Sequence, residues 1–159
     1  NDVAGAGDVD ADGLADLLIG ARSWADSTGT RCGAAYLFYG GGLSGTVSLD
    51  TADTRFFGVT KSGYLGAGVG TAGDVDADGY DDVLIGYGRD DELHLFRAPI
   101  PAGDLTLTDA DADLYQWSGN GYAGQVGEPG DHDGDGYDDI AVSSPDAWGR
   151  VWLSAGGLD

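Results

Sequence analysis

The sequence predicts an all-β protein built from three repeats of a small antiparallel sheet. A nine-residue acidic segment occurs three times, as DVDADGLAD at 8–16, DVDADGYDD at 74–82 and DHDGDGYDD at 131–139. A short apolar run rich in β-branched residues follows each copy, which is typical of a buried strand. The chain also has 30 glycines and no long periodic apolar stretch, a composition that favours short strands and turns over helices.

Each repeat is predicted to contain four antiparallel strands, except that the third lacks its outer strand. The strands of the first repeat are expected at residues 3–6, 17–21, 34–39 and 47–49. Those of the second are expected at 66–73, 83–87, 92–97 and 105–108. Those of the third are expected at 125–128, 140–143 and 150–154. Repeated four-stranded sheets without intervening helices are the blades of a β-propeller, so we expect blades at about 1–60, 61–118 and 119–159.

The three acidic segments have the composition of calcium-binding loops. Carboxylates at positions 1, 3 and 5 converge only where the backbone curls tightly, and glycine at position 6 permits that turn. Position 7 offers a backbone carbonyl and position 9 a fourth carboxylate. Because all these donors are hard oxygens, Ca²⁺ is the expected cofactor, with three sites. The predicted ligands are Asp8, Asp10, Asp12, Leu14, Asp16, Asp74, Asp76, Asp78, Tyr80, Asp82, Asp131, Asp133, Asp135, Tyr137 and Asp139.

The loops begin like those of an EF-hand, but the residues after them differ. An EF-hand loop ends with Glu at position 12 and is flanked by helices. Here position 12 is Ile19, Ile85 or Val142, each inside a predicted strand. A solvated acidic turn is the alternative reading of any one loop, but three copies in register argue against it. The order of segments instead places each loop in the hairpin between the first and second strands of a blade.

The repeats resemble FG-GAP repeats, the calcium-binding blades of integrin α-subunit propellers and related bacterial proteins. The resemblance rests on Gly-Asp-x-Asp-x-Asp-Gly-x-x-Asp followed by an apolar strand, and it covers nearly the whole chain. The Phe-Gly position reads Leu65-Gly66 in the second repeat and Tyr122-Ala123 in the third. Propellers close with about four to eight blades. We therefore expect a portion of a larger propeller, or edge-to-edge association with further blades or another copy.

Composition excludes several partners. The chain carries 28 acidic residues against one Lys and six Arg, for a net charge of −21, which argues against nucleic acid and anionic membrane surfaces. No apolar run reaches the roughly 18 residues of a membrane span, so no membrane insertion is expected. Cys32 is the sole cysteine, so no intramolecular disulfide forms. With no disulfide, the bridging role is expected to be taken by metal, and calcium loops of this kind suit an extracellular, cell-surface or periplasmic location.

The rim opposite the calcium loops is the expected ligand face. Second-to-third and fourth-to-first connections meet there, because successive turns of a meander alternate between its two ends. Aromatic and arginine side chains on such loops suit a protein or glycan ligand, and the resembling integrin propellers carry ligand on this face. The alternative for Phe57, Tyr64, Trp117 and Tyr122 is packing between blades. The candidate ligand-binding residues are Trp24, Arg31, Arg89, Trp148 and Arg150.

Together these features predict a calcium-stabilised, non-catalytic propeller module for recognition or adhesion. Catalysis at the loops is not expected, because carboxylates that bind calcium are held ionised and leave no free acid. Two alternatives remain open. The segment could be a substrate-binding or scaffold propeller of a larger secreted enzyme, or a purely structural spacer of a surface protein.

Overall fold

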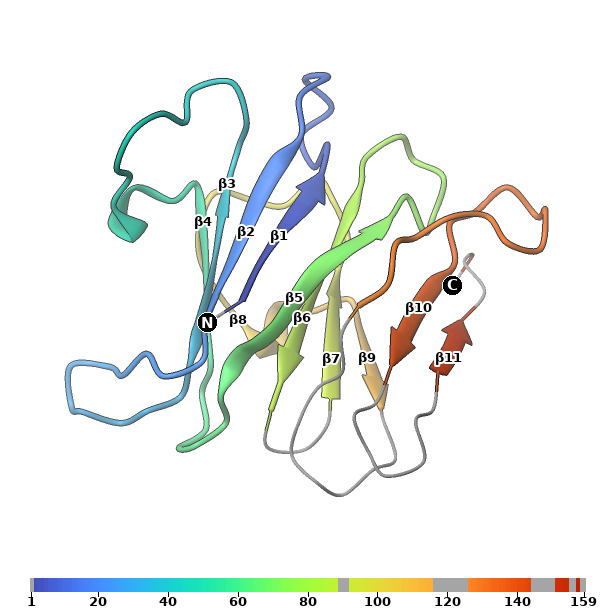
Figure 1. Ribbon diagram of the computed structural model, residues 1–159. Helices are drawn as coiled ribbons and strands as arrows, with labels where there is room; N and C mark the ends of the chain where they lie inside the picture. The colour runs from blue at the N-terminus through green and yellow to red at the C-terminus, as the bar shows by residue number, and fades with distance from the viewer. Residues whose placement is uncertain (1, 89–91, 116–125, 144–150, 155–156, 158–159) are drawn as a thin grey trace.

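The computed structural model describes residues 2–88, 92–115, 126–143, 151–154 and 157, which form three β-sheets. Figure 1 shows the three sheets side by side, in chain order. Helical structure in the described residues consists of two 3₁₀ turns, η1 (Leu49–Thr51) and η2 (Leu107–Asp109). The predicted all-β fold class is therefore confirmed. Neither turn is long or apolar enough to serve as a membrane-spanning helix.

The sheets follow the repeats of the sequence. The first sheet, in spatial order, consists of β1 (Asp2–Gly7), β2 (Asp16–Ala21), β3 (Ala34–Phe38), β4 (Thr54–Phe57) and β8 (Gly103–Thr106). The second sheet consists of β5 (Leu65–Gly73), β6 (Asp82–Tyr87), β7 (Glu92–Phe96) and β9 (Ala112–Tyr115), all antiparallel. The third pairs β10 (Ile140–Ser143) with β11 (Val151–Ser154). Such sheets are consistent with propeller-like blades.

The fourth strand of each complete repeat begins later than predicted. Residues 47–49 lead into η1, which precedes β4. Residues 105–108 span the end of β8 and the start of η2, and β9 begins after η2. Their alternating apolar residues imitate a strand, but pairing with the third strand starts only after the 3₁₀ turn. A carboxylate, Asp53 or Asp111, then accepts the N–H of the residue just beyond the third strand, at 2.9 and 2.7 Å. These carboxylates set where the fourth strand begins.

The first sheet has five strands where four were predicted, because β8 of the second repeat joins it. β8 runs parallel to β4, and the Arg55 guanidinium lies 2.6 Å from the Asp104 carboxylate across this pair. The Thr54 hydroxyl also donates to the carbonyl oxygen of Pro101 at 2.9 Å, just before β8. An uncovered edge strand would expose a row of unpaired backbone groups. β8 covers β4 and ties the second repeat to the first.

The sheets stack face to face, with the core between them. Side chains alternate along each strand, so Leu18 of β2 faces the second sheet whereas Leu17 and Ile19 lie on the opposite face. The layer between the first and second sheets includes Leu18, Leu37, Phe56, Val83, Ile85 and Phe96. The layer between the second and third includes Leu84, Leu93, Leu95, Ile140 and Val142.

The third repeat is described only in part. Val126 forms an isolated antiparallel bridge with Val142, and the N–H of Gly127 donates to the carbonyl of Ala141 at 2.7 Å. Residues 126 and 127 of the strand predicted at 125–128 therefore pair with β10 as expected, but as an isolated bridge and not as a continuous strand. Residues 125 and 150, at the limits of two predicted strands, lie outside the described residues.

Glycines let the first and second sheets approach closely where β2 crosses β5. Gly66 has a φ of 75°, in the left-handed region that side chains disfavour. A Cβ added there would overlap the carbonyl oxygen of Ala34, and one added to Gly20 would overlap the carbonyl oxygen of Gly66. Backbone atoms cannot move aside as a flexible side chain can, so this contact requires glycine on both strands.

We expect Gly66→Ala to lower the free energy of unfolding by about 2–5 kcal/mol, from left-handed strain plus overpacking. Urea denaturation measures the loss. The control is Gly42→Ala in an exposed loop, where an added Cβ meets no atom within 4 Å; it should change stability by under about 1 kcal/mol. Equal stability of the two variants would contradict the close packing of these sheets.

Candidate metal centre

The acidic segments lie at equivalent places in the three repeats. The first joins β1 to β2, the second joins β5 to β6, and the third precedes β10. All three loops lie toward the upper side of Figure 1, whereas the β2–β3 connection lies at the lower side. This placement agrees with the predicted hairpin position: strands flank the first two loops and a strand follows the third, where an EF-hand would have helices.

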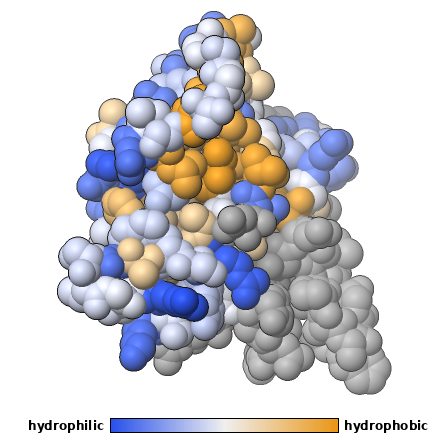
Figure 2. Space-filling model, turned by 60° about the vertical axis from the view of Figure 1, so that its left-hand side comes forward, coloured by the Kyte–Doolittle hydropathy of each residue, from blue (hydrophilic) through white to orange (hydrophobic). Residues whose placement is uncertain are grey.

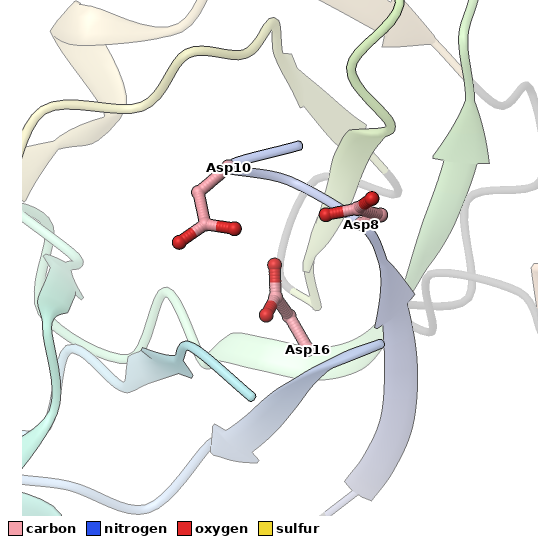
Figure 3. Close-up of side chains that lie close together, drawn as sticks. All are labelled: Asp8, Asp10 and Asp16. Carbon is pink, nitrogen blue, oxygen red and sulfur yellow. The ribbon is translucent and has the colours of Figure 1, made fainter. Parts of the chain in front are cut away.

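Three carboxylates converge in each loop. In the first, oxygens of Asp8, Asp10 and Asp16 lie within 4.8 Å of one another, and Figure 3 shows these side chains directed at a common point. Carboxylate oxygens also lie within 4.8 Å of one another in the second loop, between Asp74, Asp76 and Asp78, and in the third loop, between Asp131, Asp133 and Asp139. The remaining predicted carboxylates are Asp12, Asp82 and Asp135, which fall outside these three groups. The carbonyls of Leu14, Tyr80 and Tyr137 stay predictions.

Backbone N–H groups curl each loop around its first carboxylate. Asp8 accepts the N–H of Asp12 through one oxygen and that of Gly13 through the other, both at 3.0 Å. Asp74 and Asp131 accept the corresponding N–H groups in their loops at 3.0–3.1 Å. The glycine at position 6 has a φ of 87°, 92° and 94° in the three loops. Glycine is therefore required at position 6, as predicted, because the backbone there is left-handed.

A second left-handed position escaped the sequence reasoning. Position 4 has a φ of 56° at Ala11, 58° at Ala77 and 83° at Gly134. An alanine in this region is strained, and such strain persists only where its surroundings enforce it. Gly134 was the available signal, because the third loop places glycine where the other two carry alanine.

The carboxylate at position 9 is buried and fastens the loop to its surroundings. Asp16 accepts the N–H of Val9 at 2.7 Å and that of Gly40 at 2.8 Å. Gly40 belongs to the β3–β4 connection, so one side chain joins two connections on the same rim. Asp82 does the same in the second repeat, accepting the N–H of Val75 and, beyond β7, of Ala98. This role of position 9 was not predicted.

Burial also perturbs these carboxyl groups. It raises the pKa of Asp82 to about 7, opposed by the N–H groups of Ala98 and Val75 and assisted by the charges of Asp76 and Asp78. Burial likewise raises the pKa of Asp16, against the hydrogen bonds from Gly40 and Val9. A neighbouring divalent cation favours the ionised form of such groups.

The donor set fits a hard divalent cation. Oδ1 of Asp76 is buried and has no hydrogen-bond partner among the described residues, although a buried charged oxygen normally requires one. Its other oxygen, Oδ2, lies 3.5 Å from Nη1 of Arg97, which supplies only part of the positive charge that three converging carboxylates require. Carboxylate oxygens suit Ca²⁺ or Mg²⁺ rather than a softer metal.

The candidate ligand residues are only partly described. Trp24 is half-buried, its ring 4.7 Å from that of Phe57, so it packs against the outer face of the first sheet. Arg31 is exposed on the same β2–β3 connection. Phe57 belongs to β4 and packs against Trp24 on this outer face, so it does not pack between two of the described sheets. Three candidates lie outside the described residues, namely Arg89, Trp148 and Arg150.

A further basic contact on this rim escaped the sequence reasoning. The Arg22 guanidinium lies 5.7 Å from the ring centroid of Tyr64, within the range of a cation–π interaction. Arg22 follows β2 and Tyr64 precedes β5, so the contact joins connections of two repeats. The sequence carries no signal for it, since 42 residues separate the two positions.

Comparisons with known proteins find partial similarity to integrin α subunits. The chain is 34% identical over 85 residues to integrin alpha-5 of Xenopus laevis, a match to 51% of this chain. It is 37% identical over 83 residues to integrin alpha-PS2 of Drosophila melanogaster, a match to 50%. The matched region spans 8% and 6% of the length of these curated relatives. No family model matches the chain. Half of the chain is thus similar to integrin α subunits.

We expect Asp10→Asn to weaken calcium binding at the first loop about tenfold or more. The substitution keeps an oxygen but removes one of three converging charges, and ligand charge sets the affinity of calcium sites. Calorimetric titration with calcium chloride measures the change. Asp50→Asn, which removes an exposed charge outside the loops, is the control. Superimposable isotherms for Asp10→Asn and the unsubstituted protein would remove Asp10 from the ligand set.

Proposed function

We propose that this chain is a calcium-stabilised, non-catalytic propeller module for recognition or adhesion. The observation that carries the proposal is the convergence of three carboxylates in each of three equivalent loops. The stacked antiparallel sheets and the partial similarity to integrin α subunits support it. The three repeats serve as blades at about 1–60, 61–118 and 119–159, with β8 crossing from the second to the first.

Calcium would act through stability. Unit charges about 4 Å apart repel by on the order of 4 kcal/mol at an intermediate effective dielectric constant. A loop that gathers three carboxylates opposes folding unless a cation offsets the repulsion. At a dissociation constant near 10⁻⁵ M and roughly millimolar calcium, each site contributes about 2.7 kcal/mol, and three contribute about 8. That contribution is comparable to the whole stability of a typical domain.

We expect excess chelator to lower the melting temperature by about 10 °C or more, because the loss of several kcal/mol shifts the melting of a chain this size by a few degrees per kcal/mol. Differential scanning calorimetry in calcium and in chelator measures the shift. Magnesium at the same concentration tests metal preference and should restore less stability, because Mg²⁺ gives up its water reluctantly. An unchanged melt in chelator would remove the structural role.

The outer face of the first sheet suits a further blade. Leu17 of β2 pairs with Phe38 of β3 just as Val83 of β6 pairs with Phe96 of β7. In the second sheet this face is covered by the first sheet. In the first sheet it lines a groove of about 360 Å³, visible as a continuous apolar area in Figure 2. The residues of the groove include Leu17, Ile19, Phe38, Leu43, Val47 and Leu49. We propose association with a further blade there, through this face and not edge to edge as expected from the sequence.

The rim opposite the calcium loops is the proposed ligand face, for a protein or a glycan. Arg31 is exposed there, and the half-buried Trp24 adds apolar area. Aromatic and arginine side chains contribute most to recognition energy where they are held in place. Stabilisation by calcium in place of a disulfide suits an extracellular, cell-surface or periplasmic setting.

We expect the calcium-loaded chain to bind a member of a protein or glycan array, and Arg31→Ala to reduce that binding about tenfold with an unchanged melting temperature. The matched control is Arg55→Ala, which removes a cation from the β4–β8 pair, away from the β2–β3 connection that carries Arg31. Binding that survives Arg31→Ala at full strength would place the ligand elsewhere.

A further inference from the structure

Consecutive acidic loops are joined by a carboxylate that the metal sites do not use. Position 8 is Asp81 in the second loop and Asp138 in the third. Oδ2 of Asp81 accepts the N–H of Asp8 at 2.7 Å, and the N–H of Asp81 donates to the carbonyl oxygen of Asp8 at 3.1 Å. Each loop thus reaches back to the first residue of the loop before it.

The same pair of hydrogen bonds recurs one repeat later. Oδ2 of Asp138 accepts the N–H of Asp74 at 3.1 Å, and the N–H of Asp138 donates to the carbonyl oxygen of Asp74 at 3.1 Å. Asp8 and Asp74 are the position-1 carboxylates around which their loops curl. The incoming Asp therefore fixes the backbone of the residue that organises the preceding site.

The glycine before position 1 makes room for this contact. Gly7 and Gly73 have φ values of 82° and 71°, and a Cβ on either would overlap the carboxylate of Asp81 or Asp138. Gly130, before the third loop, is not left-handed, and no carboxylate of the described residues comes within 4 Å of a Cβ built there. Among the described residues, the left-handed glycine thus occurs where a following loop inserts its Asp, and Gly130, where no described loop does so, lacks that conformation.

We propose that Asp81 and Asp138 are positioning residues that couple each metal site to the loop that follows it. The inference rests on the proposed calcium function of the loops. A carboxylate that accepts a backbone N–H makes a charge-assisted hydrogen bond, and it pulls the first residue into the conformation in which its side chain faces the centre of the loop. Each position-8 carboxylate therefore supports the site of the preceding loop: Asp138 of the third loop supports the second site, and Asp81 of the second loop supports the first.

The test is a calcium titration of ¹⁵N-labelled protein followed by NMR, with the position-6 amides of Gly13, Gly79 and Gly136 reporting the three loops. We expect Asp81→Ala to raise the midpoint at Gly13 about tenfold, the usual effect of losing a hydrogen bond to a charged group. We expect Asp138→Ala to raise the midpoint at Gly79 and leave Gly13 unchanged. Asp81→Asn keeps an acceptor oxygen and should have an intermediate effect.

Ala15→Asp is the matched control, since Ala15 occupies position 8 of the first loop. It adds a charge at the same place in the motif, where no described loop precedes, and should leave the midpoints at Gly79 and Gly136 unchanged. A merely structural role would shift all three reporters together in Asp81→Ala and in Asp138→Ala. That result would overturn the inference, as would an unchanged midpoint at Gly13 in Asp81→Ala.

Hydrogen exchange in the unsubstituted protein keeps the test decisive if the alanine variants do not fold. The amides of Asp8 and Asp74 should exchange more slowly than that of Asp131, and equal exchange would also overturn the inference. Failure of the calcium function is distinguishable, because Gly13, Gly79 and Gly136 of the unsubstituted protein would then not respond to calcium. A response with no effect of Asp81→Ala would leave calcium binding in place and remove only the coupling.

Discussion

The structure depends on holding like charges together. Each acidic loop brings three carboxylates within 4.8 Å, an arrangement that electrostatics opposes. The backbone provides the first compensation, since at least two N–H groups of the loop donate to each position-1 carboxylate. Left-handed backbone at positions 4 and 6 makes that curl possible. The remaining charge is what a divalent cation would neutralise, so metal binding and folding are expected to be linked.

The same loops also organise the stacking of the sheets. The position-9 carboxylate joins its loop to the next connection of its own repeat, as Asp16 does with Gly40. The position-8 carboxylate reaches across to the loop of the preceding repeat, as Asp81 does with Asp8. The same set of hydrogen bonds therefore fixes both the geometry of the acidic loops and the relative placement of the sheets. A change in one loop has a direct physical route to its neighbour.

Much of the architecture followed from periodicity. The second and third strands were predicted within a residue or two, because β-branched runs such as Val83 to Tyr87 are bounded by small or turn-forming residues. The fourth strands were misplaced, because alternating apolar residues at 47–49 and 105–108 imitate strand periodicity, whereas pairing begins only after Asp53 and Asp111, which accept the N–H just beyond the third strand. β8 was assigned to the wrong sheet, since nothing local to residues 103–106 indicates a parallel partner about fifty positions earlier.

The sequence by itself determined the all-β class, the three repeats and the positions of the acidic loops. These features are local: a strand is recognised by alternation and an acidic loop by the spacing of its carboxylates, and both are complete within about ten residues. Only the tertiary structure decided which carboxylates converge, that Asp16 and Asp82 also bind distant N–H groups, and that Asp81 and Asp138 join neighbouring loops. Contacts of this kind join residues from 16 to 73 positions apart. The contacts of Asp16 and Asp82 arise from strand pairing within one sheet, and those of Asp81 and Asp138 from the stacking of neighbouring sheets; no local pattern encodes either.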